Sequence, residues 1–160
     1  MRAIGFGEQL RISRRQDKGA AHIGNISKKE QTRRAQLAAS ARAVLREALP
    51  IEYEDSTSLS VNLSEWYLQI SFSPLHPLMV ICLARAIPIP ASVAQFLDTN
   101  AMNLHSILGC HTINSDTHCY AYRATQWLDT ELTRERFMEM LHRCMGEAER
   151  GYEKILKNKL

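Results

Sequence analysis

The sequence contains no apolar run long enough to cross a membrane. A spanning helix needs about 20 consecutive apolar residues, and the longest run here covers only residues 78–84. The N-terminal residues also lack the apolar stretch of a secretory signal. The sequence therefore predicts a soluble, cytoplasmic protein.

Glycine, proline and paired cysteines are also scarce. Seven glycines and five prolines among 160 residues exclude collagen-like and low-complexity chains. The four cysteines form no Cys-x-x-Cys pair, and a chain of this length can build a core without disulfides. With 45% hydrophobic and 23% charged residues, the composition predicts one globular domain with free thiols.

The chain lacks the local signatures of catalysis. It has no Gly-x-Ser-x-Gly motif, and Gly5 and Gly7 have neither the preceding strand nor the third glycine of a phosphate-binding loop. The carboxylates of Glu52, Glu54 and Asp55 fall in an expected solvated loop rather than in a paired acid–base site. We predict a protein that is not an enzyme and needs no cofactor.

One cluster resembles a metal site, because Cys110 and His111 precede a polar turn that His118 and Cys119 follow. Zinc requires four donors that converge at about 2.0 to 2.3 Å, but neighbouring residues on a strand point to opposite faces. A two-residue turn would place both cysteines on one face, and a three-residue loop would place one cysteine with one histidine. Neither register gathers all four side chains, so we predict no metal site.

Positive charge is concentrated near the N-terminus. Residues 1–34 hold nine basic and three acidic side chains, a net +6, whereas residues 35–160 hold eleven basic and fourteen acidic ones, a net −3. We therefore expect a basic, flexible arm over residues 1–26 and a single domain over residues 27–160. A nucleic-acid contact by the arm is a less favoured alternative, because Phe6 is its only aromatic residue.

Hydrophobic periodicity predicts three helices and five strands. Ser27 and Glu30 form a capping-box pattern at the start of a helix that ends by Pro50, and Thr133 precedes a long C-terminal helix. Strands are expected over residues 59–63, 66–72, 78–87, 107–113 and 118–127, and a short helix over residues 91–106. The order α-β-β-β-α-β-β-α predicts an α+β fold with helices on one face of an antiparallel sheet.

This order, together with local motifs in the C-terminal half, resembles the class I chaperones of bacterial type III secretion systems. The stretch Val93-Ala-Gln-Phe96-Leu97-Asp-Thr-Asn100 is similar to the family's helix ending in Leu-Leu-x-x-Asn. Further matches are Ile107-Leu-Gly109 opening a strand, Tyr120 and Tyr122 in the next strand, and Leu128-Asp129 and Leu132-Thr133 before a long helix. The resemblance covers residues 30–160, and the basic arm departs from it.

The resemblance implies a non-enzymatic homodimer that binds the N-terminal segment of a secreted effector, keeps it extended and helps deliver it to the export apparatus. An open sheet edge and apolar pockets would suit such a client. The implied client-binding residues are Leu37, Val44, Leu45, Trp66, Leu68 and Ile70, and the implied dimer-interface residues are Phe96, Leu97 and Leu104. Each of the six client-binding residues has an alternative place in the chain's own core.

Two other classes of protein are alternatives at the level of sequence. A regulatory domain of the related YbjN type would have a similar fold, and a fold alone does not determine function. A nucleic-acid-binding protein would depend on the basic arm, and its complex would weaken as the salt concentration rises.

Overall fold

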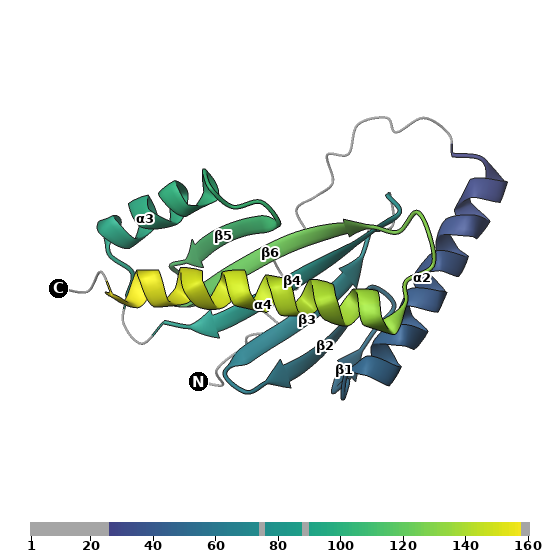
Figure 1. Cartoon of the computed structure of the whole chain (residues 1–160), viewed down its shortest axis with the longest axis horizontal. Helices are drawn as coiled ribbons and strands as arrows, with labels where there is room; N and C mark the ends of the chain where they lie inside the picture. Colours follow the sequence, from purple (N-terminus) through teal and green to yellow (C-terminus); the bar gives the residue numbers. More distant parts are fainter. Residues whose placement is uncertain (1–25, 74–75, 88–89, 158–160) are drawn as a thin grey trace.

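The chain folds around one antiparallel sheet in a computed structural model that describes residues 26–73, 76–87 and 90–157. Within these residues, six strands follow the order β1-β2-β3-β4-β6-β5 (Figure 1). The strands are β1 (Tyr53–Glu54), β2 (Ser58–Leu63), β3 (Trp66–Phe72), β4 (Leu78–Ala86), β5 (Gly109–Asn114) and β6 (Cys119–Trp127). The helices are α2 (Lys28–Ala48), α3 (Val93–Asn103) and α4 (Arg134–Lys157).

The predicted α+β fold and its element order are confirmed, and β1 is an addition where a loop was expected. Most of the predicted basic arm lies outside the described residues.

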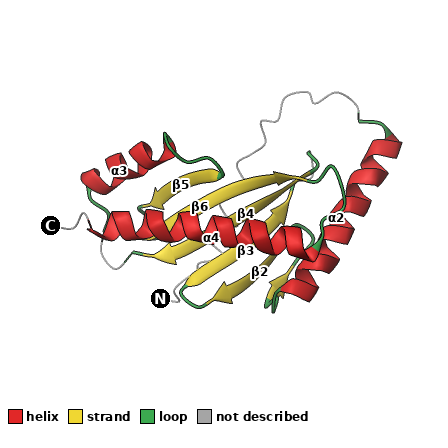
Figure 2. Ribbon diagram, in the orientation of Figure 1, coloured by secondary structure: helices red, strands yellow, loops and turns green. Residues whose placement is uncertain are grey.

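Helix α4 lies across one face of the sheet (Figure 2). Directly paired residues of antiparallel strands share a face, so the register defines which side chains lie beneath the helix. One such row consists of Leu59, Ile70, Ile81 and Ala124. The helix packs onto this face with Phe137, Leu141, Cys144, Ala148, Tyr152 and Ile155. The period-two pattern of the strands and the long apolar stripe of the last helix therefore meet in a single core.

Helix α2 is capped as predicted at its N-terminus. The Ser27 hydroxyl accepts the backbone N–H of Glu30 at 3.2 Å. The carboxylate of Glu30 does not return to Ser27 but pairs with Arg33 and Arg34, both at 2.8 Å, and these arginines lower the pKa of Glu30 to about 2. The capping box read from the sequence is thus only half formed, because two arginines on the next turn compete for the carboxylate.

The C-terminal half of α2 is tied to the first two strands by arginines. Arg42 and Arg46 pair with Glu54 at 2.8 and 2.7 Å, and Arg42 also donates to two carbonyls of the β1–β2 turn. Arg46 and Arg42 lower the pKa of Glu54. Glu54, expected in a solvated loop, therefore helps to attach the helix to the edge of the sheet.

The β5–β6 hairpin adopts a register different from both of those considered. Asn114 pairs with Cys119 across a connection that includes His118, whose φ is +47°. Cys110 and Cys119 consequently share one face of the sheet, while His111 points to the helical face. Among the described residues no group of three or more histidine, cysteine or acidic side chains is placed to hold a metal ion. None of the described helices has the length and apolar character that a membrane span requires.

Candidate functional site

Helix α3 turns its polar side inward and its apolar side outward. Its N-cap Ser92 forms a full capping box with Gln95. Gln95 is 1% exposed and donates from Nε2 to the carbonyl of Ile155 at 2.9 Å. By contrast, Val93, Leu97 and Leu104 are 76%, 66% and 82% exposed. Surface helices normally have the reverse arrangement, so α3 offers an apolar contact surface.

The exposed apolar side chains continue from α3 into the loop before β5. We call this group the α3 surface, and its members are Val93, Phe96, Leu97, Leu104, Ile107 and Leu108. It contains all three residues predicted for the dimer interface, Phe96, Leu97 and Leu104, each of which is exposed. Their role in dimerisation stays a prediction.

The side chain of Asn103, the last residue of α3, bonds to the outer backbone edge of β5 near the middle of that strand. The side-chain amide of Asn103 donates to the carbonyl of His111 at 2.9 Å, and its oxygen accepts the N–H of His111 at 2.6 Å. These are the two backbone groups that an added strand would engage at this point. The edge of β5 is therefore already occupied by the chain itself at His111.

Strand β6 extends beyond β5 and leaves a strand position empty. β5 reaches only as far as the pair of Gly109 with Ala124, whereas β4 pairs with β6 up to Trp127. The N–H of Leu128 donates to the carbonyl of Pro77 on the β4 side at 2.7 Å. Because successive residues of a strand alternate their bonding direction, the backbone groups of Thr125 and Trp127 face the side where β5 has ended. We call this place the vacant strand position.

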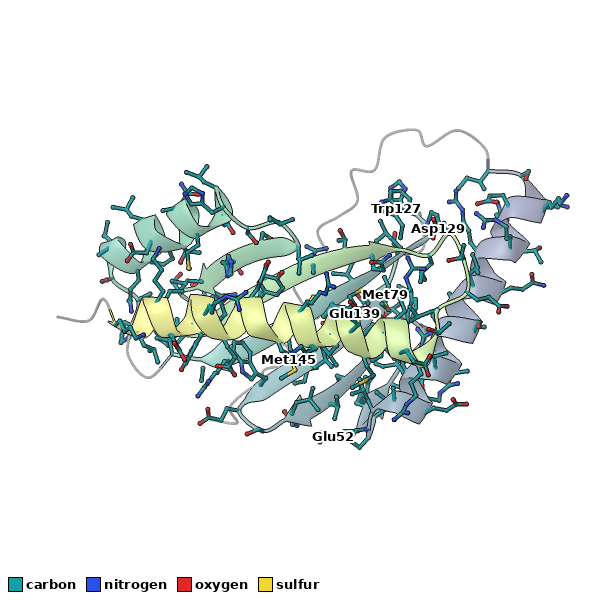
Figure 3. All side chains as sticks on the ribbon, viewed as in Figure 1. Glu52, Met79, Trp127, Asp129, Glu139 and Met145 are labelled. Atoms are coloured by element: carbon teal, nitrogen blue, oxygen red, sulfur yellow. The ribbon has the colours of Figure 1, made fainter. Side chains whose placement is uncertain are left out.

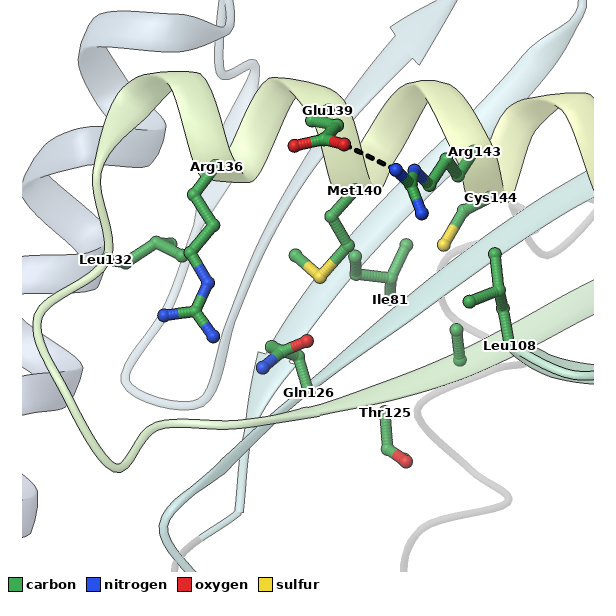
Figure 4. Close-up of a pocket in the computed structure, with 11 residues that line it drawn as sticks. Ile81, Leu108, Thr125, Gln126, Leu132, Arg136, Glu139, Met140, Arg143 and Cys144 are labelled. Carbon is green, nitrogen blue, oxygen red and sulfur yellow. Dashed lines mark hydrogen bonds and ion pairs between the residues drawn. The ribbon is translucent and has the colours of Figure 1, made fainter.

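A pocket of about 230 Å³ lies beside the vacant strand position, between β6 and the N-terminal half of α4 (Figure 4). Its apolar lining consists of Ile81, Leu108, Ala124, Leu132, Met140 and Cys144. Its polar lining consists of Thr125, Gln126, Arg136, Glu139 and Arg143. The pocket exists because β5 ends before it would pass beneath this part of α4.

The two arginines of the pocket differ in their partners. Arg143 pairs with Glu139 at 2.5 Å, at the end of the pocket near Leu108 (Figure 4). Arg136 lies at the other end, near Leu132, and donates to the Thr130 hydroxyl at 3.3 Å. Among the described residues, no carboxylate pairs with Arg136. One end of the pocket is therefore electrically balanced and the other carries an available positive charge.

Trp127 lies at the outer end of the vacant strand position. Its side chain is 59% exposed and projects near Asp129 (Figure 3). The backbone carbonyl of Asp129 accepts a hydrogen bond from Arg33 at 3.2 Å, which ties the end of β6 to α2. The Trp127 carbonyl accepts the side-chain amide of Gln126 at 3.0 Å, a bond that an added strand would displace. A large exposed aromatic side chain is typical of a protein contact site.

A buried polar network fixes the loop that leads into β5. Tyr122 donates to Glu147 of α4 at 2.6 Å, and Ser106 donates to the same carboxylate oxygen at 3.1 Å. His111 bonds to the Tyr120 hydroxyl at 2.6 Å. Burial lowers the pKa of His111, although Glu147 acts in the opposite direction, and burial raises the pKa of Tyr120. The uncharged forms are thus favoured, and the network holds the start of β5 in place rather than supplying a reactive group.

The six residues predicted to bind a client are not brought together on one surface. Leu45, Trp66, Leu68 and Ile70 are at most 3% exposed and form part of the core. Leu37 and Val44 of α2 are half-buried and pack against that core. Their contact with a client stays a prediction. The vacant strand position was missed, although the expected strands 107–113 and 118–127 already differed in length.

Neither a protein-family model nor a curated protein sequence matches this chain. Among solved structures, YbjN from E. coli has a similar fold, with a TM-score of 0.54 at 13% identity over 75% of this chain and 89% of that one. The HopA1–SchA chaperone–effector complex gives a TM-score of 0.48 at 11% identity, over 78% of this chain and 99% of that one. The ExoT–SpcS complex from Pseudomonas aeruginosa gives a TM-score of 0.48 at 15% identity, over 69% of this chain and 96% of that one. The likeness to YbjN supports the fold that the sequence resemblance implied, and function must be argued from the site.

Proposed function

We propose that the chain binds an extended segment of another protein and holds it without chemical reaction, as a secretion chaperone would. The observation that carries this proposal is the vacant strand position beside an apolar pocket. A segment continuing the line of β5 would pair its backbone with Thr125 and Trp127. Its side chain opposite Gln126 would share the face of that residue and enter the pocket.

The client we propose is the N-terminal segment of a secreted effector, as the sequence resemblance implies. Only a segment without its own strand partners can fill the vacancy, so binding selects an unfolded stretch and keeps it extended. This is the state that passage through an export apparatus requires, and binding would take place in the cytoplasm before export. The interaction needs neither a cofactor nor a catalytic group.

We also propose that two copies associate through the α3 surface. Gln95 and Thr99 are the buried residues of α3, and Met102 packs against the core, whereas Val93, Leu97 and Leu104 remain exposed. A twofold axis would bring this surface against its own copy, which is the commonest arrangement of homodimers. The two proposed contacts are centred on different elements, the vacancy along β6 and the dimer contact along α3, and they meet at Leu108, which belongs to the α3 surface and also lines the pocket.

The test of client binding replaces Thr125 by proline. Proline removes the N–H that faces the vacancy and leaves the bonds of β6 to β4 in place. A phage-displayed library of short random peptides is selected on the wild-type protein, and the enriched peptides are then measured on the variants. We expect Thr125→Pro to lose the peptides and Thr125→Ala, which keeps the N–H, to retain them. Equal binding by Thr125→Pro would exclude the vacancy as the client site.

The test of dimerisation replaces Leu97 or Leu104 by aspartate. We expect light scattering to give twice the 18.2 kDa chain mass for the wild type and the single mass for either variant. Ala94→Asp, an exposed change of the same helix away from the stripe of Val93, Leu97 and Leu104, is the matched control and should stay dimeric. A wild-type protein that is monomeric at every concentration would overturn the proposed contact.

A further inference from the structure

We propose that the site reads a short sequence pattern: an apolar residue that fills the pocket and an acidic residue two positions before it that pairs with Arg136. This inference rests on the proposed function of the same site, and it adds the amino-acid pattern of the segments that the site binds. It follows from the size of the pocket, the direction of the sheet and the distribution of charge.

The pocket suits a single large apolar side chain. Its volume of about 230 Å³ is below the roughly 300 to 1,000 Å³ of typical small-molecule sites. Ile81, Ala124 and Met140 offer only apolar contacts on the side of the sheet that carries α4. Thr125 and Trp127 point to the opposite face, so the neighbours of the inserted residue would not share the pocket. One position of the segment is therefore selected for apolar character.

The antiparallel sheet determines the direction of the segment. All strand pairs among the described residues are antiparallel, including β5 with β6. A segment in the line of β5 would therefore run against β6. The residue two positions before the one opposite Gln126 would lie opposite Leu128, on the same face. That is the end of the pocket where Figure 4 shows the Arg136 guanidinium.

The charge distribution distinguishes the two ends of the pocket. Arg143 is already neutralised by Glu139, next to the apolar side chain of Leu108. The guanidinium of Arg136 bonds only to the neutral hydroxyl of Thr130 within the described residues. Glu139, one turn along α4, is paired with Arg143, and Asp129 lies beside Arg33, where its charge contributes to raising the pKa of Arg33. An acidic side chain of the segment would therefore find a guanidinium without a competing carboxylate.

The experiment sequences the peptides selected by the wild type, by Arg136→Glu and by the control Arg134→Glu. Arg134 is exposed on the same helix and does not line the pocket. We expect the wild type and Arg134→Glu to enrich Asp or Glu two positions before a large apolar residue. Arg136→Glu should enrich Lys or Arg there instead. For one synthetic consensus peptide, changing its acid to lysine should weaken binding to the wild type about fivefold and strengthen binding to Arg136→Glu.

The outcomes separate this inference from the proposed function. Peptides that need the apolar residue and the Thr125 N–H but show no acidic preference would overturn the inference and leave the function standing. An acid enriched after the apolar residue, or an acidic preference that Arg136→Glu does not change, would overturn it too. A wild-type selection that enriches no peptide would overturn both. Circular dichroism of each variant confirms that a loss of binding does not reflect unfolding.

Discussion

Gly151 in α4 is required by its neighbours on the sheet. A Cβ atom at this position would lie 2.6 Å from Nδ1 of His111 and closer still to the Tyr120 hydroxyl. Both neighbours are buried and bonded to each other, so neither has room to move aside. We predict that Gly151→Ala lowers the free energy of unfolding by about 1 to 3 kcal/mol, as measured by urea denaturation.

Gly146 of the same helix is the matched control. The nearest atom to a Cβ there is the end of the flexible Arg150 side chain, at 3.4 Å. Alanine is the better helix former, so Gly146→Ala should raise the free energy of unfolding by up to about 1 kcal/mol. If both variants were equally stable, the contact of Gly151 with His111 and Tyr120 would not constrain the fold.

The burial of His111 should make stability depend on pH. Burial lowers the pKa of His111 in the folded chain from its ordinary value of 6.5. The unfolded chain then binds the proton more readily, so stability is fully present above about pH 6.5 and is lost as the pH falls toward the folded pKa. The urea concentration at the midpoint of unfolding should therefore decrease as the pH is lowered from about 7.5 to about 5.5. The decrease should be smaller for His111→Gln. If the urea midpoint changed equally with pH in the wild type and in His111→Gln, the pH dependence would arise from groups other than His111.

At the scale of elements, Asn103 should protect the edge of β5. Asn103→Ala leaves the N–H and carbonyl of His111 without their partner, at a cost of about 1 to 3 kcal/mol. We expect the His111 amide to exchange faster with deuterium in the variant, by NMR. Asn100→Ala, an exposed change on the same helix, should leave that exchange unaltered. Unchanged protection in Asn103→Ala would show that another group shields the edge.

Most elements could be predicted because local patterns determine them. The period-two run of residues 66–72 coincides with β3, and Thr133 caps α4 by accepting the N–H of Arg136 at 3.2 Å. The helix expected over residues 91–106 is shorter, since Ser92 caps its start and Asn103 turns to β5 at its end. These boundaries depend on contacts that periodicity does not describe.

The candidate site could not be predicted in the same way. The spacing of Val93, Phe96 and Leu97 is identical whether a helical stripe faces the core or the solvent. The contact of Gln95 with the carbonyl of Ile155, sixty residues away in sequence, decides which side is buried. The vacancy likewise depends on the register of the β5–β6 hairpin, because a shift of β5 along β6 would cover or enlarge it.

For the whole molecule, association through α3 would couple stability to concentration. A partner that binds only the folded state raises the apparent free energy of unfolding. Over about a hundredfold increase in protein concentration, the midpoint of thermal unfolding should therefore rise by several degrees, or about 2 to 4 °C for each kcal/mol. Leu97→Asp should abolish this rise. A wild-type midpoint independent of concentration would argue against the dimer.

The short length of the vacancy has a consequence for solubility. Long, flat strand edges recruit further copies and grow into fibrils. Here β1 has two residues, Asn103 occupies the middle of β5, and the unfilled stretch of β6 spans only Thr125 to Trp127. Such interrupted strand edges are poor templates for edge-to-edge pairing between copies. Backbone pairing over so few residues is weak by itself, and a side chain anchored in the pocket is what would make a complex last.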